Sequence, residues 1–324
     1  MYNYSKSDLE RMASETNFIR DNLEKILRLC DILRHLNENP LFAEYLALKG
    51  GTAINLTVFK LPRLSVDIDL DFTKECSRDE MMTIRETINQ DFLNYMFTQG
   101  YALSPNTKSP HSLDSWVFYF QNSGGNRDNL KVEVNYSLRN HILPIVKRRV
   151  NVDFIQLDSE VRTLSTLELF GSKIKALIER TAPRDLYDIY NMLRYEIIHP
   201  DDMDILRKII LFYIAVGGSD KPSDNYNFDN IDNLKFAQIK SSLLPVLKKS
   251  DRFDFESAKI GVKSFLLDLM IFTEEEQSFI GNFNNNVYRP ELLFENTEII
   301  ERIQNHPMAI WKMRNSEITS IPTF

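Results

Sequence analysis

The chain has 324 residues, of which 43% are hydrophobic and 26% charged, and it carries a formal net charge of −7. This composition excludes a disordered chain, and a mean hydropathy of −0.31 without an apolar run of about twenty residues excludes a membrane span. The acidic balance argues against a protein that coats duplex nucleic acid, but it permits a local basic groove.

Two cysteines, Cys30 and Cys76, are too few for a disulfide framework or a zinc knuckle. The N-terminal residues lack the apolar segment of a secretory signal. We therefore expect a cytoplasmic protein with reduced thiols.

The first half of the chain mixes helical and extended patterns. Apolar spacing predicts a helix over 8–36, Pro40 opens a short helix or turn over 40–48, and residues 53–56 begin another helix. The pattern then predicts a strand over 64–72, a helix over 80–100 and strands over 116–121 and 130–137, which a turn at 122–126 connects. These elements predict helices around a small sheet.

Helical spacing dominates the second half. Helices are predicted over 167–180, 184–195, 202–216 and 257–270, and the polar stretch 217–233 is predicted as a loop. We therefore predict an α+β fold, with a small mixed sheet and flanking helices over 1–157 and a mostly helical C-terminal lobe over 158–324.

Three aspartates alternate with apolar residues in the strand predicted over 64–72. Asp67, Asp69 and Asp71 would share one face about 7 Å apart, while the apolar residues enter a core. Such carboxylates repel one another unless they lie in water or share a cation. A divalent ion such as Mg²⁺, which takes oxygen ligands, is one solution; a solvated edge strand is the alternative.

Paired glycines precede these aspartates. Gly50 and Gly51 lead into a predicted helix, where backbone N–H groups can approach a phosphate. The Thr52 hydroxyl can add a donor or cap the helix. An ordinary turn is the alternative, but the spacing to Asp67 permits a short helix and a return strand. That arrangement would place a phosphate cradle beside a metal site.

Further polar candidates lie on a later strand and on two helices. Glu133 could add a third carboxylate if its strand lies beside Asp67–Asp71, or it could be an exposed strand residue. Lys173 and Arg180 share a helix face, and Asp185 lies near the start of the next helix. Salt bridges on solvated helices are the alternative for these charges.

Four segments together resemble the AbiEii/AbiGii toxin-type nucleotidyltransferases of the DNA polymerase β-like superfamily. The segments are KGGTAINL at 49–56, RLSVDIDLDF at 63–72, KVEVNY at 131–136, and SKIKALIER with PRDLYDIY over 172–190. Their order and spacing make the resemblance specific over about 40–195. It implies a nucleotidyltransferase core and a helical lobe.

The resemblance also implies roles for individual residues. Asp67 and Asp69 would be the metal ligands, and Glu133 would be a less securely matched third acid. Lys173 would contact the triphosphate, and either Asp185 or Asp188 would supply a further acid. The nucleotide would be held by Gly50, Gly51, Thr52, Arg63, Ser65, Lys173 and Arg184. Gly-Gly-Thr replaces the Gly-Ser that is common in the superfamily, as in the toxin-type branch.

The implied activity is Mg²⁺-dependent transfer of NMP from an NTP to a tRNA 3′ end or a protein. The chain would act as the toxin of a toxin–antitoxin or abortive-infection system, with a cognate antitoxin. Candidates for a local tRNA-binding groove are Lys147, Arg148, Arg149, Lys173, Lys175 and Arg180. The alternatives are a non-catalytic nucleotide- or antitoxin-binding member of the fold, and a phosphotransferase on the same fold.

Overall fold

The computed structural model describes residues 4–150, 152, 154–155, 160–218 and 221–315. The predicted boundary between residues 157 and 158 lies outside these residues. The chain forms two compact units. Unit 1 comprises Met1–Arg139, Ile145–Leu164 and Lys240–Arg252, and unit 2 comprises Asn140–Pro144, Ser165–Ile239 and Phe253–Phe324. Residues 240–252 thus join unit 1, although the sequence placed them in the C-terminal lobe.

Unit 1 is built around a mixed sheet of seven strands in the described residues, in the order β3-β4-β5-β2-β1-β7-β6. The strands are β1 (Leu46–Lys49), β2 (Asp67–Phe72), β3 (Ala102–Leu103), β4 (Leu113–Gln121), β5 (Arg127–Asn135), β6 (Val146–Arg149) and β7 (Glu160–Thr163). The helical segments are α1 (Lys6–Thr16), α2 (Arg20–Glu38), α3 (Pro40–Tyr45), α4 (Gly50–Ala53), the π-helical turn η1 (Ile54–Val58) and α5 (Arg78–Thr98).

The N-terminal helix predicted over 8–36 is two helices. Asn17 ends α1 in the left-handed conformation, with φ 61°, and Phe18 is buried. Asn is one of the few residues that adopt this conformation readily, so a break at this point needs no glycine. Helix α2 then buries one apolar face that includes Leu23, Ile26 and Leu33.

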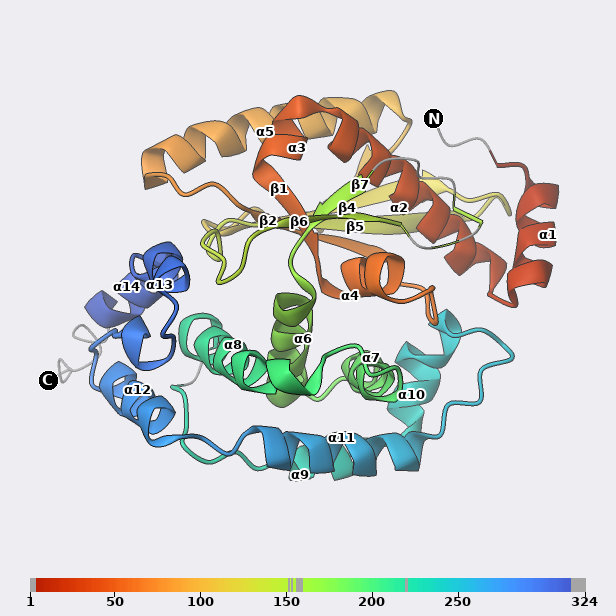
Figure 1. Cartoon of the computed structure of the whole chain (residues 1–324). Coiled ribbons are helices and arrows are strands. Elements are labelled where there is room, and N and C mark those ends of the chain that lie inside the picture. Colours follow the sequence, from red (N-terminus) through yellow and green to blue (C-terminus); the bar gives the residue numbers. More distant parts are fainter. Residues whose placement is uncertain (1–3, 151, 153, 156–159, 219–220, 316–324) are drawn as a thin grey trace, which may run out of the picture. The chain divides into compact units, whose positions relative to one another are not determined.

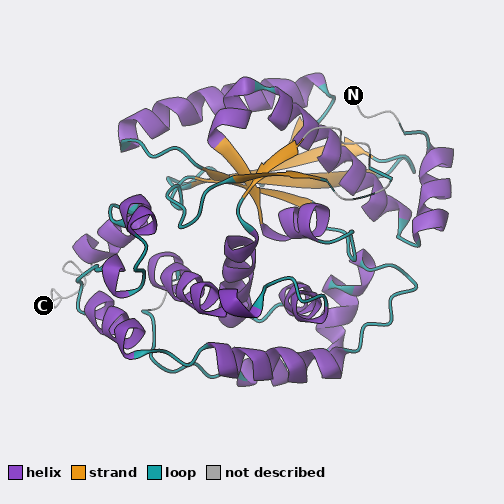
Figure 2. Cartoon of the chain, in the orientation of Figure 1, coloured by secondary structure: helices purple, strands orange, loops and turns teal. Residues whose placement is uncertain are grey.

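The two faces of the sheet differ in chemistry because side chains alternate along each strand. On β2, the side chains of Ile68, Leu70 and Phe72 are buried. The helices α2, α3 and α5 lie on one side of the sheet and α4 lies on the other, as Figures 1 and 2 show. Helix α5 supplies Phe92, whose ring lies 5.0 Å from that of Trp116 on β4.

Unit 2 is helical in its described residues. Its helices are α6 (Thr166–Arg180), α7 (Pro183–Arg194), η2 (Pro200–Asp202), α8 (Met203–Gly217), α9 (Asp229–Asp232), α11 (Phe255–Leu269), α12 (Glu274–Asn284), η4 (Pro290–Leu292), α13 (Thr297–Ile303) and α14 (Pro307–Asn315). The segment Lys240–Arg252, which belongs to unit 1, contains η3 (Leu244–Val246), and α10 (Phe236–Ser242) spans the point where unit 1 resumes. The sheet of unit 1 and the helices of unit 2 confirm the predicted α+β class.

Two contacts explain how the helices of unit 2 pack. A side chain at Gly171 of α6 would lie 2.5 Å from Ile209 Cγ2 of α8, so glycine permits the close approach of these helices. The fully buried Glu168 carboxylate accepts hydrogen bonds from the Ile142 N–H (2.9 Å) and the Tyr213 hydroxyl (2.6 Å). It thereby holds the segment Asn140–Pro144 in unit 2. Within the described ranges, every helix is too short or too polar to cross a membrane.

Candidate active site

The glycine pair begins the candidate site in unit 1. Gly50 follows β1 with φ +68°, a left-handed conformation that favours glycine. A Cβ at this position would lie 2.6 Å from Asp69 Oδ2. The turn therefore needs glycine both for its backbone conformation and because the Asp69 carboxylate lies against it.

The second glycine brings Arg63 and Ser65 to the same turn. A Cβ at Gly51 would lie 2.8 Å from Arg63 Nη2 and 3.0 Å from Ser65 Oγ. Arg63 is buried, and its Nη1 donates to the Leu64 carbonyl at 3.0 Å. The structure thus brings together residues that the sequence placed in two separate motifs.

Thr52 connects helix α4 to the aspartate strand. Its side chain is fully buried, and its hydroxyl donates to the backbone carbonyl of Asp67. Thr52 does not cap the helix, which was one of the two roles that the sequence left open. The hydroxyl fixes the helix start beside β2.

The three aspartates of β2 do not share one environment. Asp67 and Asp69 are partly exposed, whereas Asp71 is buried and forms an ion pair with Lys49 Nζ. Burial raises the pKa of Asp71 above its usual value, although the Lys49 ammonium acts in the opposite direction. The three carboxylates that alternation places on one face therefore differ in environment. Asp67 and Asp69, which the resemblance implies as the metal ligands, are the two that are partly exposed.

Glu133 lies beside these acids, which is the arrangement in which it could add a third carboxylate. Strand β5 runs parallel to β2, with Glu133 in register with Asp69 and Lys131 in register with Asp67. Lys131 Nζ lies 2.9 Å from Glu133 Oε1. Glu133 thus belongs to the polar face, but it forms an ion pair with its own strand neighbour.

The donor set at Asp67 and Asp69 fits a hard divalent cation. Carboxylate oxygens are its preferred ligands, and Mg²⁺ commonly uses one or two protein carboxylates and completes its coordination with water and substrate phosphates. In the part of the chain that the structure describes, no group of three or more His, Cys, Asp or Glu residues is placed to hold a metal ion.

The acids and bases predicted on the two helices form a compact group in unit 2. Lys173 Nζ lies 2.9 Å from Asp185 Oδ1 and 3.2 Å from Asp188 Oδ2, and Arg180 Nε lies 2.7 Å from Asp185 Oδ2. Asp185 and Asp188 are fully buried. Burial alone would raise the pKa of Asp185, but the Lys173 and Arg180 cations outweigh it and lower the pKa.

Three of the six cations predicted to line a tRNA-binding groove lie on α6 and have acidic neighbours. Lys173 and Arg180 are ion-paired as described, and Lys175 lies 2.7 Å from Glu179. Neighbouring acids thus neutralise all three cations. By contrast, Lys147 and Arg149 on the edge strand β6 are exposed, and Arg148 is partly exposed. Arg184, the other candidate phosphate ligand, is partly exposed on the first turn of α7.

Sequence reasoning gave Lys49 no role, yet it controls which aspartates stay accessible. In the antiparallel β1–β2 pair Lys49 is in register with Asp69, but its ammonium binds the next acid of that face, Asp71. A lysine directly before the glycine pair was a visible signal. Its partner was not visible, because the register of β1 against β2 cannot be read from either segment alone.

A comparison with known protein families identifies the family of this chain. Residues 31–267 match the model of the nucleotidyl transferase AbiEii toxin family of type IV toxin–antitoxin systems, and the chain belongs to this family. No curated protein matches the chain significantly by sequence.

A solved structure has a similar fold. It is MenT4, a nucleotidyltransferase toxin from Mycobacterium tuberculosis H37Rv, with a TM-score of 0.61 over 95% of this chain and 99% of that chain. The two sequences are 12% identical, so this likeness concerns the fold alone.

Proposed function

We propose that this chain transfers the nucleoside monophosphate of an NTP to an acceptor hydroxyl, and that Asp67 and Asp69 hold the divalent cation this reaction uses. One observation carries the proposal: the Asp69 carboxylate lies against the left-handed Gly50 turn at the start of α4. A carboxylate pair and a helix start that offers N–H groups would then lie side by side. They suit the metal ion and the phosphates of one substrate.

The chain's own residues would position the two reactants. The acceptor oxygen forms a bond to the α-phosphorus, the bond between the α- and β-phosphates breaks, and pyrophosphate leaves. The hydroxyl proton passes to a nearby carboxylate or to water. When bound, Mg²⁺ would neutralise phosphate charge and polarise the phosphoryl oxygens. Gly50, Gly51, Arg63 and Ser65 would orient the triphosphate, and Thr52 would hold the helix start against β2.

Lys173, Arg184 and one of Asp185 and Asp188 are the further residues to which the family resemblance gives a role in this reaction. The acceptor we propose is a tRNA 3′ end, supported by the exposed Lys147 and Arg149, with a protein hydroxyl as the competing acceptor. Modification of such an acceptor would arrest growth, which is the role we propose for this toxin in its toxin–antitoxin system.

The test is incubation with NTP labelled at the α- or the γ-phosphate, with Mg²⁺ and total RNA or cell protein. We expect α-label in the acceptor, and no transfer in the presence of EDTA. Transfer of γ-label would show a phosphotransferase instead. Binding of NTP without transfer of either label would identify a non-catalytic member of the fold.

Matched variants make the test specific. Asp67→Asn and Asp69→Asn should each abolish transfer. Asp128→Asn is the control, because Asp128 lies on β5 but pairs with Lys25, 2.7 Å away. Equal activity in all three variants would contradict the assignment of the metal ligands.

A further inference from the structure

The polar face of the sheet extends from the aspartate pair onto the β4–β5 hairpin. In register, Asp69 lies next to Glu133, and Glu133 next to Ser115 on β4. Successive rows away from Asp69 pair Lys131 with Val117, Asn129 with Tyr119, and Arg127 with Gln121. Because alternate residues share a face, these side chains form one surface that is continuous with the candidate metal site.

An aromatic ring and a guanidinium group stack on this surface. The guanidinium carbon of Arg127 lies 3.6 Å from the centre of the Tyr119 ring. Arg127 and Asn129 are exposed, and Tyr119 is partly exposed. The other aromatic residues of β4, Trp116, Phe118 and Phe120, are buried in the core. Tyr119 is therefore the aromatic residue of this strand that is available to a ligand.

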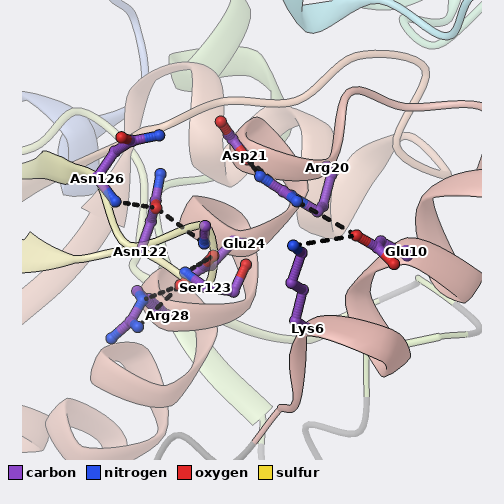
Figure 3. A network of polar contacts seen from close by, with 10 residues as sticks. Lys6, Glu10, Arg20, Asp21, Glu24, Arg28, Asn122, Ser123 and Asn126 are labelled. Atoms are coloured by element: carbon purple, nitrogen blue, oxygen red, sulfur yellow. Dashed lines mark hydrogen bonds and ion pairs between the residues drawn. The ribbon is translucent and has the colours of Figure 1, made fainter.

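The turn of the hairpin is fixed to helix α2. The Ser123 N–H donates to Glu24 Oε2 at 2.8 Å, and the fully buried Glu24 also binds Arg28 at 2.8 Å (Figure 3). Asn122 Oδ1 accepts from the N–H groups of Gly124 and Asn126 at 3.0 and 2.9 Å. A ligand on this surface would meet a preformed hairpin, so little ordering would oppose binding.

We propose that Tyr119 and Arg127 form a stacking platform for an unpaired base of a single-stranded RNA acceptor, with Lys131 and Asn129 beside the connecting backbone. This proposal rests on the proposed nucleotidyl transfer. Nucleobases stack on aromatic rings and on arginine planes, and the exposed Arg127 cation complements phosphate charge.

The position of the platform sets which base it holds. Four residues along β5 and two strand spacings separate Tyr119 from Asp69, which is roughly 16 Å. This is several times the rise of ~3.4 Å per nucleotide in a stacked strand. The platform would hold a base upstream of the terminal nucleotide, whose hydroxyl lies at the metal site.

The first test measures binding without catalysis. The probe is a short single-stranded RNA with a 5′ fluorophore and a free 3′ hydroxyl, added to the Asp69→Asn protein and followed by anisotropy. Tyr119→Leu should weaken binding about tenfold or more, in line with the loss of one base stack, whereas Tyr119→Phe should retain it. Arg127→Gln should weaken binding and reduce its salt dependence.

A similar pair elsewhere provides the control. Arg194 lies 5.6 Å from the ring of the exposed Tyr195 on unit 2, and Tyr195→Leu should leave binding unchanged. If Tyr119→Leu lowers the midpoint of thermal unfolding, the RNA affinity of Arg127→Gln tests the platform instead, because the Arg127 side chain is exposed. Wild-type affinity in Arg127→Gln and in a stable Tyr119→Leu would overturn the platform.

The second test separates this proposal from the proposed function. Transfer of α-label to protein, with no binding of the RNA probe, would overturn the platform and leave nucleotidyl transfer intact. Platform-dependent RNA binding without transfer of α-label would contradict the proposed function alone. Transfer to RNA with an acceptor KM raised in Tyr119→Leu, and an unchanged KM for NTP, is the result that we expect.

Discussion

Two buried aspartates, one in each unit, form ion pairs with lysines but differ in the direction of their pKa shift. Asp71 receives one ammonium, from Lys49, and its pKa is raised by burial. Asp185 receives Lys173 and Arg180 together, and its pKa is lowered despite burial. The pair in unit 2 thus belongs to a group with two cations and two acids, which balances its own charge.

The group in unit 1 has a different balance. On the polar face and at its glycine turn, four acids accompany three cations, namely Asp67, Asp69, Asp71 and Glu133 with Lys49, Lys131 and Arg63. Asp67 and Asp69 are partly exposed next to the glycine turn. The comparison teaches that acids buried against lysine and arginine side chains serve the fold, whereas partly exposed carboxylates beside a backbone turn can accept an added cation.

The largest effect should come from the acid that this comparison assigns to chemistry. Asp69→Asn should reduce nucleotidyl transfer by on the order of a thousandfold. The substitution removes a negatively charged carboxylate that would hold the metal ion at the reacting phosphate. Its thermal stability should be equal or higher, because repulsion between neighbouring carboxylates is relieved. Single-turnover kinetics and calorimetry measure both. An active variant, or an inactive one with a much lower melting temperature, would assign Asp69 to the fold instead.

The next effect concerns the balanced group. Lys173→Met should cost about 3–5 kcal/mol in the free energy of unfolding, because it leaves two fully buried acids with one cation. Lys49→Met should cost less, since the raised pKa of Asp71 eases its protonation. Urea denaturation at neutral pH compares the variants. If Lys49→Met were the more damaging, our ranking of the two groups would be reversed.

Lys173 also carries the prediction, made from its motif, that it contacts the triphosphate. NTP affinity of folded Lys173→Met tests this role separately from stability. Lys175→Ala is the control on the same helix, because its pair with Glu179 is partly exposed and such pairs contribute about 0–1 kcal/mol. Unchanged NTP affinity in Lys173→Met would restrict this lysine to the structural group.

A smaller effect is expected at the glycine turn. Gly50→Ala should destabilise the protein by about 1–3 kcal/mol, because φ is +68° and the new Cβ would meet Asp69 Oδ2. Gly125→Ala is a matched control, with φ +83° and no atom within 4 Å of the added Cβ. The difference between the two variants isolates the contact with Asp69. Equal losses of stability in the two variants would mean that the left-handed backbone alone accounts for the need for glycine at residue 50.

The smallest effect is a difference in pH dependence. The folded pKa of Asp185 is below its usual value, so its ionisation contributes stability above the unfolded pKa of about 3.9, and this contribution is lost as pH falls through the folded pKa. The raised pKa of Asp71 acts in the opposite sense: its contribution is present below the unfolded pKa and is lost as pH rises through the folded one.

Urea titrations across the acid range can separate the two. Asp185→Asn should flatten the loss of stability on acidification, and Asp71→Asn should steepen it. The slopes against pH are compared, because either substitution also changes the stability at neutral pH. Parallel slopes in the two variants would show that these aspartates share one environment after all.

Several long elements of the fold were predictable because a long segment gives its pattern enough residues to be recognised. The helices over 80–100 and 167–180 and the two longer hairpin strands lie close to their predicted ranges. The short strands β1, β3, β6 and β7 were not predicted, because two to four residues are too few to show an alternating pattern. The strand that was predicted from residue 64 begins at Asp67, because the Leu64 N–H instead donates to the Val246 carbonyl.

The sequence by itself determined the types of residue in the candidate site: a glycine pair, alternating aspartates and a lysine–acid helix pair in a specific order. Only the tertiary structure decided which acids remain accessible. Asp67, Asp69 and Asp71 are equivalent in the pattern, yet strand pairing brings Lys49 to one of them and Gly50 to another. The physical reason is that ion pairing and burial act between strands, and alternation within one strand holds no information about its neighbour.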